Sequence, residues 1–266
     1  MKGRVLIIAG SDSGGGAGIQ ADIKTVTALN GYAATAIVAL TAQDTRGIHA
    51  VHEVPVAFIR QQISLTLKDI GADALKTGML SNAEVISAVR EELDTHAPEV
   101  PLVVDPVMVA KGDTKLLGTG AEGALIEILL PRATLITPNA TEAEVLVRMR
   151  IRTRSEQDQA AERLLRLGAR AVLLKGGHIE GEEVRDLLLT HEGRQEFCGP
   201  RIHTTSTHGT GCTLASAIAT GLAQRLPLYE AVARAHAYVR EALRSAPGFG
   251  RGHGPLNHAH TVATMS

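Results

Sequence analysis

Short apolar segments alternate with longer amphipathic segments along most of the chain. The short segments are of strand length and predict buried strands at Val5–Ala9, Ala34–Leu40, Ala74–Lys76, Leu102–Asp105, Leu135–Thr137 and Ala171–Lys175. Apolar residues at helical spacing predict helices over about Ala17–Asn30, from Pro55, after a capping Ser81, over Glu122–Leu129, and from a capping box at Ser155-Glu156-Gln157-Asp158 to Leu167. This alternation is typical of an α/β fold, in which helices cover both faces of a mostly parallel sheet.

The C-terminal third follows a different pattern. Two short strands, Leu187–Thr190 and Glu196–Cys198, flank the segment His191-Glu192-Gly193-Arg194 and predict an antiparallel hairpin. A loop rich in Thr and Gly comes next, followed by two helices over about Gly211–Gln224 and Leu228–Ser245. No internal repeat, linker or shift in composition divides the chain, so we expect a single domain over residues 1–266.

The charge balance argues against several classes of partner. The chain has 27 basic and 28 acidic residues, a net charge of −1 and only 2% aromatic residues, which disfavours nucleic-acid binding. Its apolar runs are far shorter than the roughly 20 residues of a membrane-spanning helix, and its first residues lack the apolar core of a signal peptide. We therefore expect a cytoplasmic protein with no nucleic-acid partner and no membrane partner.

The two cysteines are too few for a disulfide framework or a cysteine zinc site. Cys198 lies in the predicted hairpin and is interpreted as a small buried residue. Cys212 lies in the first turn of a predicted helix, where the helix terminus lowers the pKa of a thiol toward the thiolate. A thiolate there could act as a general base toward an alcohol, and the alternative is a second small buried cysteine.

Ligands of an open parallel sheet bind beyond the carboxyl ends of its strands, so the residues that follow each strand are the candidates for a site. Five glycines occur within Gly10–Gly18, after the first strand, and allow a ligand to approach the backbone closely. The segment lacks both the Gly-Lys-Ser/Thr of a Walker A loop and the G-x-G-x-x-G spacing. Asp12 within it favours recognition of a polar ligand over a simple flexible turn.

Two carboxylates and an amide follow the fourth and fifth strands. Asp105 ends the fourth strand, and Asn139 and Glu142 come shortly after the fifth. If these strands are neighbours, the three side chains meet, and hard oxygen ligands of this kind suit Mg²⁺. Alternatively, Asp105 caps a turn, and Glu142 only complements the positive end of a helix dipole.

Glycine and threonine are concentrated in Thr205–Thr213, directly before an apolar helix. Successive N–H groups of a Gly209-Thr210-Gly211 turn at a helix N-terminus form a cradle for an anion. Lys175, which is followed by two glycines, emerges from the sixth strand and could neutralise a nucleotide phosphate. The alternative for Lys175 is a surface lysine before a turn.

Taken in order, these motifs resemble those of the ribokinase superfamily and, more narrowly, of the bacterial hydroxymethylpyrimidine/phosphomethylpyrimidine kinases. The similarity runs nearly end to end and is carried by Ala9–Asp22, Ala39–Gly47, Lys76–Leu80, Asp105–Met108, Thr137–Glu142, Lys175–His178, Thr207–Thr213 and Gly252–His258. The resemblance implies a ribokinase-like three-layer αβα sandwich, with a mostly parallel central sheet and a small β lid or edge region.

The resemblance also implies a role for each motif. Gln43 would hydrogen-bond the aminopyrimidine ring of the substrate, and the other residues implied to bind substrate are Gly10, Asp22, Met79 and Val107. Cys212 would occupy the position of the catalytic base, beside an anion hole formed by the backbone of Gly209, Thr210 and Gly211. The implied ATP contacts are Asn139, Lys175 and Thr207, and the implied Mg²⁺ ligands are Asp105 and Glu142. Asp44 departs from the family pattern, in which we expect Asn, and either alters substrate preference or faces a turn.

The implied reaction is transfer of the γ-phosphoryl group of ATP to 4-amino-5-hydroxymethyl-2-methylpyrimidine and then to its monophosphate, in thiamine biosynthesis. A pyridoxal kinase of the cysteine type is the nearest alternative, while a sugar kinase would be expected to carry Asp in place of Cys212. A non-catalytic binding protein of this fold would need neither Cys212 nor Lys175. Residues from about Ala34 to Val54 resemble the dimer-forming region of the family, so we expect a homodimer.

Overall fold

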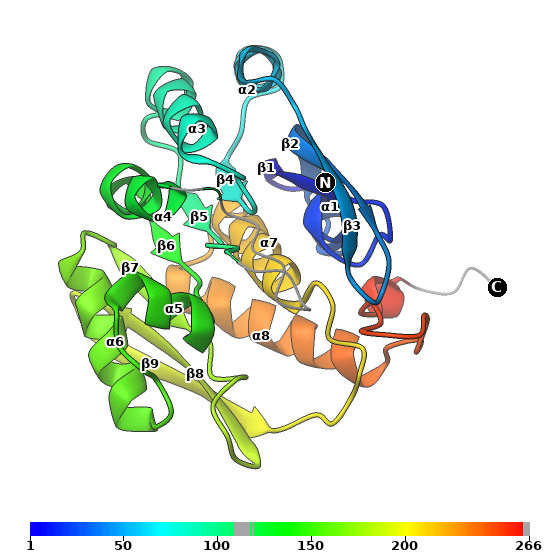
Figure 1. Cartoon of the computed structure of the whole chain (residues 1–266), viewed down its shortest axis with the longest axis vertical. Helices are drawn as coiled ribbons and strands as arrows, with labels where there is room; N and C mark the ends of the chain where they lie inside the picture. The colour runs from blue at the N-terminus through cyan, green and yellow to red at the C-terminus, as the bar shows by residue number, and fades with distance from the viewer. Residues whose placement is uncertain (109–117, 119, 263–266) are drawn as a thin grey trace.

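One mixed sheet of nine strands runs through the part of the chain that the computed structural model describes, residues 1–108, 118 and 120–262 (Figure 1). Its strands lie in the order β3-β2-β1-β4-β5-β6-β7-β8-β9. Six neighbouring strands are parallel, from β2 to β7, and β3, β8 and β9 pair antiparallel at the two edges. The strands span β1 (Arg4–Asp12), β2 (Tyr32–Gln43), β3 (Ile48–Glu53), β4 (Ala74–Thr77), β5 (Leu102–Val104), β6 (Leu135–Ile136), β7 (Ala171–Leu174), β8 (Glu183–Thr190) and β9 (Arg194–Pro200).

Helices cover both faces of this sheet, as the sequence pattern predicts. On one face lie α2 (Val56–Asp69), α3 (Ala83–His96), α4 (Ala121–Ala124), α5 (Ala140–Val147) and α6 (Arg154–Arg166). On the other face lie α1 (Gly18–Ala28), α7 (Thr210–Ala223) and α8 (Leu228–Arg244). Three short helical turns complete the described structure, namely η1 (Leu125–Leu129), η2 (Leu130–Arg132) and η3 (His258–Thr261).

Strand β1 shows why the chain forms two cores. Its side chains alternate between the faces of the sheet, so that Leu6 and Ile8 pack into the core under α2 and α3, whereas Val5 and Ile7 pack into the core under α1 and α7. All four are fully buried. A strand buried on both faces has a continuous apolar sequence, which is the pattern of central parallel strands.

Several predicted boundaries are wrong by a few residues. Ser81 does not cap α3, because it has a left-handed backbone (φ 51°), and the side chain of Asn82 accepts the capping hydrogen bond from Val85 N. The capping box of α6 is formed by Thr153 and Glu156, so that α6 begins one residue before the predicted Ser155. The hairpin is confirmed, and both of its strands are longer than predicted.

The β3 edge was missing from the strands predicted from the sequence. The side chains of β3 are exposed or half-exposed throughout, so they lack the burial alternation that marks a strand in sequence. Pairing with β3 extends β2 beyond the predicted Leu40 as far as Gln43. No helix among the described residues is long and apolar enough to cross a membrane.

Candidate active site

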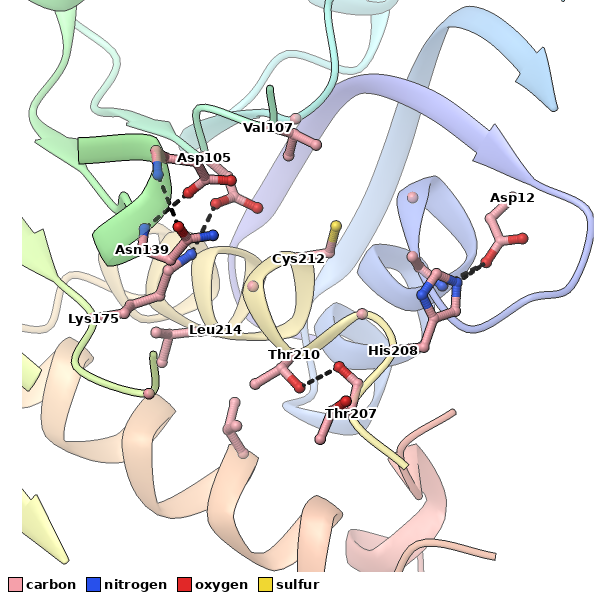
Figure 2. Close-up of a pocket in the computed structure, with 18 of the residues that line it drawn as sticks. Asp12, Asp105, Val107, Asn139, Lys175, Thr207, His208, Thr210, Cys212 and Leu214 are labelled. Atoms are coloured by element: carbon pink, nitrogen blue, oxygen red, sulfur yellow. Dashed lines mark hydrogen bonds and ion pairs between the residues drawn. The ribbon is translucent and has the colours of Figure 1, made fainter. Parts of the chain in front are cut away.

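A single cavity of about 440 Å³ opens at the carboxyl ends of the parallel strands. It brings together thirteen of the fourteen residues predicted for the site, which come from seven separate segments of the chain: Gly10, Gln43, Met79, Asp105, Val107, Asn139, Glu142, Lys175, Thr207, Gly209, Thr210, Gly211 and Cys212. Figure 2 shows the Cys212 sulfur, in this view, between the group of Asp105, Asn139 and Lys175 on one side and Asp12 with His208 on the other.

Asp22 is the predicted site residue that does not line this cavity. Its side chain is fully buried behind the cavity, where Lys76 Nζ lies 2.7 Å from Asp22 Oδ2 and Ser216 Oγ donates to Asp22 Oδ1 at 2.7 Å. Asp22 therefore cannot contact a ligand in the cavity directly, and the expectation that it binds substrate is corrected. The motif that contains Asp22 contributes a buried ion pair below the floor of the site instead.

The cradle at the start of α7 depends on close contact between two glycine segments. Gly209 precedes α7 with a φ of 82°, and a Cβ atom at this position would lie 1.8 Å from the carbonyl oxygen of Gly16. Thr213 N donates to Gly209 O at 2.9 Å, which begins the helix, and the N–H groups of the first turn lie at its positive end. The turn and the dipole therefore make an anion cradle of the kind predicted from the sequence.

Cys212 lies in the first turn of α7, as predicted, but its ionisation differs from the expectation. Removal from water raises the pKa of the Cys212 thiol to about 12, with further increases from Asp22 and Asp105. Lys76 and a hydrogen bond from the Gly18 backbone oppose this rise without overcoming it. The expectation of a lowered pKa is therefore wrong for the ligand-free protein, because desolvation outweighs the helix dipole.

Cys198 is also corrected. It lies on the edge strand β9, as the predicted hairpin requires, but its side chain is exposed rather than buried. Period-two alternation explains the error, because Phe197 next to it takes the inward position and is buried.

A buried charge cluster lies on the far side of Cys212 from His208 (Figure 2). Lys175 Nζ is 3.2 Å from Asp105 Oδ1, and Thr137 Oγ1 donates to the same oxygen at 3.3 Å. Burial would lower the pKa of Lys175, but Asp105 and Glu142 raise it above its ordinary value, so the ammonium stays charged. Lys175 is thus not the surface lysine of the alternative interpretation.

Glu142 completes this cluster. Burial raises the pKa of Glu142 to about 7, and nearby Asp105 adds to the rise against the effect of Lys175. When both carboxylates are ionised, one lysine does not neutralise them, so a further positive charge is favourable here. Oxygen donors of this kind fit a Mg²⁺ ion that also keeps water or phosphate ligands. The residues present therefore fit a magnesium ion, which Asp105 and Glu142 would hold.

Glu142 also has a structural role at the start of α5, which was its open alternative. Asn139 caps α5 by accepting a hydrogen bond from Glu142 N at 2.9 Å, and Glu142 Oε2 accepts from Asn139 N at 2.8 Å. This capping box fixes both side chains at the lip of the cavity. The structural and the functional interpretation of Glu142 are therefore compatible.

The opposite end of the cavity is narrow and partly apolar. Gly10 has no room for a side chain, since a Cβ atom there would lie 2.6 Å from Met79 Cε. Gln43 and Val107 also line the cavity. Asp44 is absent from the cavity lining and instead accepts hydrogen bonds from Arg46 N (2.8 Å) and Gly47 N (3.1 Å), so it stabilises a turn.

Sequence reasoning missed the residues that line the other arm of the cavity. Strand β8 contributes Val184 and Asp186, and α8 contributes His236, Val239, Arg240 and Leu243. Asp186 accepts a hydrogen bond from Gly176 N at 2.9 Å, and burial raises its pKa. The only signal in the sequence was an aspartate directly before the predicted strand Leu187–Thr190, because α8 itself carries none of the motifs.

Asp12 and His208 also line the cavity. The sequence favoured recognition of a polar ligand for Asp12 and assigned no role to His208. His208 Nε2 lies 2.9 Å from Asp12 Oδ2 and 3.1 Å from Gln43 Nε2. Both residues occur in motifs that sequence analysis singled out for their glycines, and those motifs were the available signal.

Comparison with known proteins agrees with this geometry. The chain matches the family model described as phosphomethylpyrimidine kinase over residues 12–257. It is 52% identical over 257 residues to the thiamine biosynthesis bifunctional protein ThiED of Geobacter sulfurreducens, covering 97% of this chain and 52% of that longer protein. It is 45% identical over 256 residues to the hydroxymethylpyrimidine/phosphomethylpyrimidine kinase of Bacillus subtilis, covering 96% of this chain and 94% of the relative.

The fold also has close relatives among solved structures. An ADP complex of Bacillus subtilis pyridoxal kinase superimposes with a TM-score of 0.91 at 35% identity, over 97% of this chain and 98% of the other. The α/β, ribokinase-like fold that the sequence motifs imply is therefore confirmed. On the family match and these identities, the chain belongs to the phosphomethylpyrimidine kinase family.

Proposed function

We propose that this protein transfers the γ-phosphoryl group of ATP to 4-amino-5-hydroxymethyl-2-methylpyrimidine and then to the resulting monophosphate, as a step of thiamine biosynthesis. The observation that carries the proposal is the single cavity in which Cys212 and the Gly209–Gly211 cradle lie between a Gln43 pocket and a Lys175 charge cluster. The identity of 45% to a full-length kinase with this name supports the choice of substrate.

The charge cluster is suited to the nucleotide. Lys175, which remains protonated beside Asp105, would contact the ATP phosphates together with Asn139 and Thr207. Asp105 and Glu142 would hold Mg²⁺, which neutralises phosphate charge when it is bound. The arm lined by β8 and α8 would receive the nucleoside, so that the γ-phosphate points to the start of α7.

The start of α7 is suited to the transferred group. Backbone N–H groups of Gly209–Cys212 would stabilise charge on the phosphoryl oxygens, which in phosphoryl transfer is the main catalytic contribution of a protein. Cys212 would face the hydroxymethyl oxygen and take its proton, although the thiolate is a minor form at neutral pH because of the raised pKa of the thiol. The second transfer has a phosphate as its acceptor, so we expect Cys212 to matter less there.

The direct test is incubation of the protein with ATP and Mg²⁺ and either the pyrimidine or its monophosphate, with detection of products by mass. We expect two successive phosphorylations by the wild type and by Cys198→Ser, a matched control whose cysteine is exposed on β9. We expect neither reaction from Lys175→Met. Absence of any phosphorylated pyrimidine with the wild type would refute the proposal.

Pyridoxal phosphorylation is the second candidate, because the pyridoxal kinase of Bacillus subtilis shares the fold at a TM-score of 0.91. The lower identity to that kinase, 35%, makes it the weaker one. Phosphorylation of pyridoxal but not of the pyrimidine in the same assay would establish this second candidate in place of the first.

Homodimer formation is also proposed. Strand β3 is an edge strand with exposed side chains, among them Val51, which is 46% exposed. Leu40 on the neighbouring strand β2 is 45% exposed, so a second copy could cover this edge. A light-scattering mass of twice 28.0 kDa is expected, and a mass of 28.0 kDa would exclude the dimer. The cytoplasmic location and the single domain over residues 1–266 stay predictions.

A further inference from the structure

Asp12, at the end of β1, is the centre of a hydrogen-bond network that joins two walls of the site. Its Oδ1 accepts from Gly14 N at 2.8 Å, and its Oδ2 accepts from Gly16 N at 3.0 Å and Ala17 N at 2.8 Å. The same Oδ2 lies 2.9 Å from His208 Nε2. Asp12 is 2% exposed, so these contacts take place away from water, where they are strongest.

The charge of Asp12 decides which ring nitrogen of His208 carries a proton. Burial would raise the pKa of Asp12, but the hydrogen bonds from His208, Ala17 and Gly14 lower it below its ordinary value, so the carboxylate is ionised at neutral pH. An ionised carboxylate only accepts hydrogen bonds. His208 Nε2 must therefore be a donor, which fixes this proton on the side of the ring that faces Gln43.

The proton on His208 in turn decides how the Gln43 amide is oriented. With the amide nitrogen of Gln43 3.1 Å from His208 Nε2, two donors would face each other. Exchange of the amide oxygen and nitrogen, which have nearly the same shape, removes this clash of two donors. Gln43 Oε1 then shares the single proton of His208 Nε2 with Asp12 Oδ2 in a three-centre hydrogen bond.

Thr41 requires the same exchange, and it does so independently of His208. The Thr41 hydroxyl donates its single proton to Ser11 O at 2.9 Å, and it also lies 3.3 Å from the other polar atom of the Gln43 amide. Because that proton forms the shorter bond to Ser11 O, Thr41 Oγ1 offers a lone pair to Gln43, and this contact is best satisfied with the amide nitrogen on this side. Two separate contacts thus select one orientation.

We propose that Asp12, His208 and Thr41 fix the donor–acceptor polarity of the Gln43 amide and so make the pocket selective for an aminopyrimidine edge. This inference rests on the proposed function, in which Gln43 contacts the ring of the substrate. Asp12, His208 and Thr41 are positioning residues, since they act through Gln43.

The chemistry of the substrate edge matches this arrangement. With one hydrogen and one lone pair of the amide held by Thr41 and His208, Gln43 keeps one N–H and one oxygen lone pair for a ligand. A 4-aminopyrimidine presents a ring nitrogen that accepts next to an amino group that donates, which pairs with both. A 4-oxo analogue presents a ring N–H and a carbonyl oxygen, so its polarity is reversed, and the hydroxymethyl group, directed to Cys212, prevents the ring from turning over.

The test compares turnover of the 4-amino substrate and of its 4-oxo analogue by wild type, Asp12→Asn, Thr41→Val and Thr41→Ser. We expect the wild type to prefer the amino compound by at least about 10³-fold in kcat/KM, because the analogue leaves polar groups unpaired. In Asp12→Asn the new amide can rotate and no longer forces His208 Nε2 to be a donor. Thr41→Val removes the hydroxyl that accepts from Gln43. In each variant the Gln43 amide can therefore take either orientation. Both variants should lower the preference at least about 10-fold, mostly through KM, and Thr41→Ser should retain it.

Lys24→Ala is the matched control. Lys24 Nζ donates to Gly15 O at 2.8 Å and holds the same glycine loop from its exposed side, outside the network. The preference of Lys24→Ala for the 4-amino substrate over the 4-oxo analogue should stay within about threefold of wild type. An unchanged preference in Asp12→Asn and Thr41→Val, with an active wild type, would overturn the inference and leave the proposed function intact. An inactive wild type would refute the proposed function itself.

Discussion

At the scale of single residues, Cys212 carries the sharpest contrast between local pattern and environment. Its position in the first turn of α7 predicts a lowered thiol pKa, whereas burial raises the pKa to about 12. The base must then act from a small population of thiolate. The rate should increase with pH, because the thiolate fraction falls about tenfold for each pH unit below the pKa.

We therefore expect kcat for the first phosphorylation to rise with pH between about 6 and 9, until another step limits the rate. Cys212→Ser should lose at least about 100-fold in this reaction and less in the second one. Cys212→Asp, whose carboxylate ionises more readily, should flatten the pH profile. Measurement of kcat against pH for both reactions decides the point, and equal losses in both would contradict a base role limited to the alcohol.

Gly209 is the second residue whose identity matters by itself. It has a left-handed φ of 82°, and a Cβ atom would meet Gly16 O at 1.8 Å, so Gly209→Ala must displace one of the two glycine segments. A displacement of about 1 Å at the reacting centre costs roughly 100-fold in rate, and we expect a loss of kcat of that size. Gly193→Ala, where a Cβ atom has nothing within 4 Å, is the control and should keep wild-type kcat.

At the scale of elements, the ion pair of Lys76 and Asp22 ties β4 to α1, and Ser216 extends it to α7. Both charged side chains are 0% exposed, and a buried pair of this kind does not by itself make a fold more stable than apolar residues would. Removal of one partner leaves the other as an unpaired buried charge. The pair thus holds three elements in register directly below the first turn of α7.

Lys76→Met should lower the free energy of unfolding by about 3–5 kcal/mol, and addition of Asp22→Asn should recover part of that loss. Arg154→Ala is the matched control, since Arg154 pairs with Glu183 at the surface, where both side chains are more than half exposed, and should cost less than about 1 kcal/mol. Urea unfolding of the wild type and these three variants tests this. Equal costs for Lys76→Met and Arg154→Ala would contradict the role given to the buried pair.

At the scale of the whole molecule, the segment that follows α8 packs against α1, near the start of the chain, and against α8 itself. His258 Nδ1 lies 3.3 Å from Thr25 Oγ1 of α1, and Tyr238 of α8 donates to His258 O at 3.2 Å. The imidazole is 8% exposed, and burial, aided by Lys24 and His260, lowers the pKa of His258 to about 4. The segment after α8 is thus held by a histidine that is neutral in the folded protein.

Between about pH 6.5 and pH 4 the unfolded chain binds a proton at His258 that the folded protein does not bind. Stability should therefore fall as pH drops through this window, by up to about 3 kcal/mol from this residue. Urea midpoints of wild type and His258→Gln at pH 7.0, 5.5 and 4.5 isolate this contribution, because all other groups are shared. We expect the two proteins to converge at low pH, and a constant difference between them would contradict the assignment.

Much of the architecture follows from sequence alone. Apolar runs such as Val5–Ala9 require burial on both faces, so they specify central parallel strands, and the polar residues after them are placed at one edge of the sheet. Thirteen of fourteen predicted site residues line one cavity for this reason. Strand β3 was not predictable in this way, because an exposed edge strand needs no apolar alternation.

The ionisation and polarity of the site depend on tertiary structure. The Asp22–Lys76 pair joins residues 54 positions apart, and the Asp12–His208 contact joins residues 196 positions apart. Spacing along a chain determines which face a side chain takes, whereas a pKa or an amide orientation depends on which distant charges arrive beside it and how much water they exclude. The sequence by itself thus determined the fold and the location of the site. Only the packing of α1 and α7 against the sheet decided that Asp22 is structural, that Cys212 is a half-buried thiol with a raised pKa, and that Gln43 has one orientation.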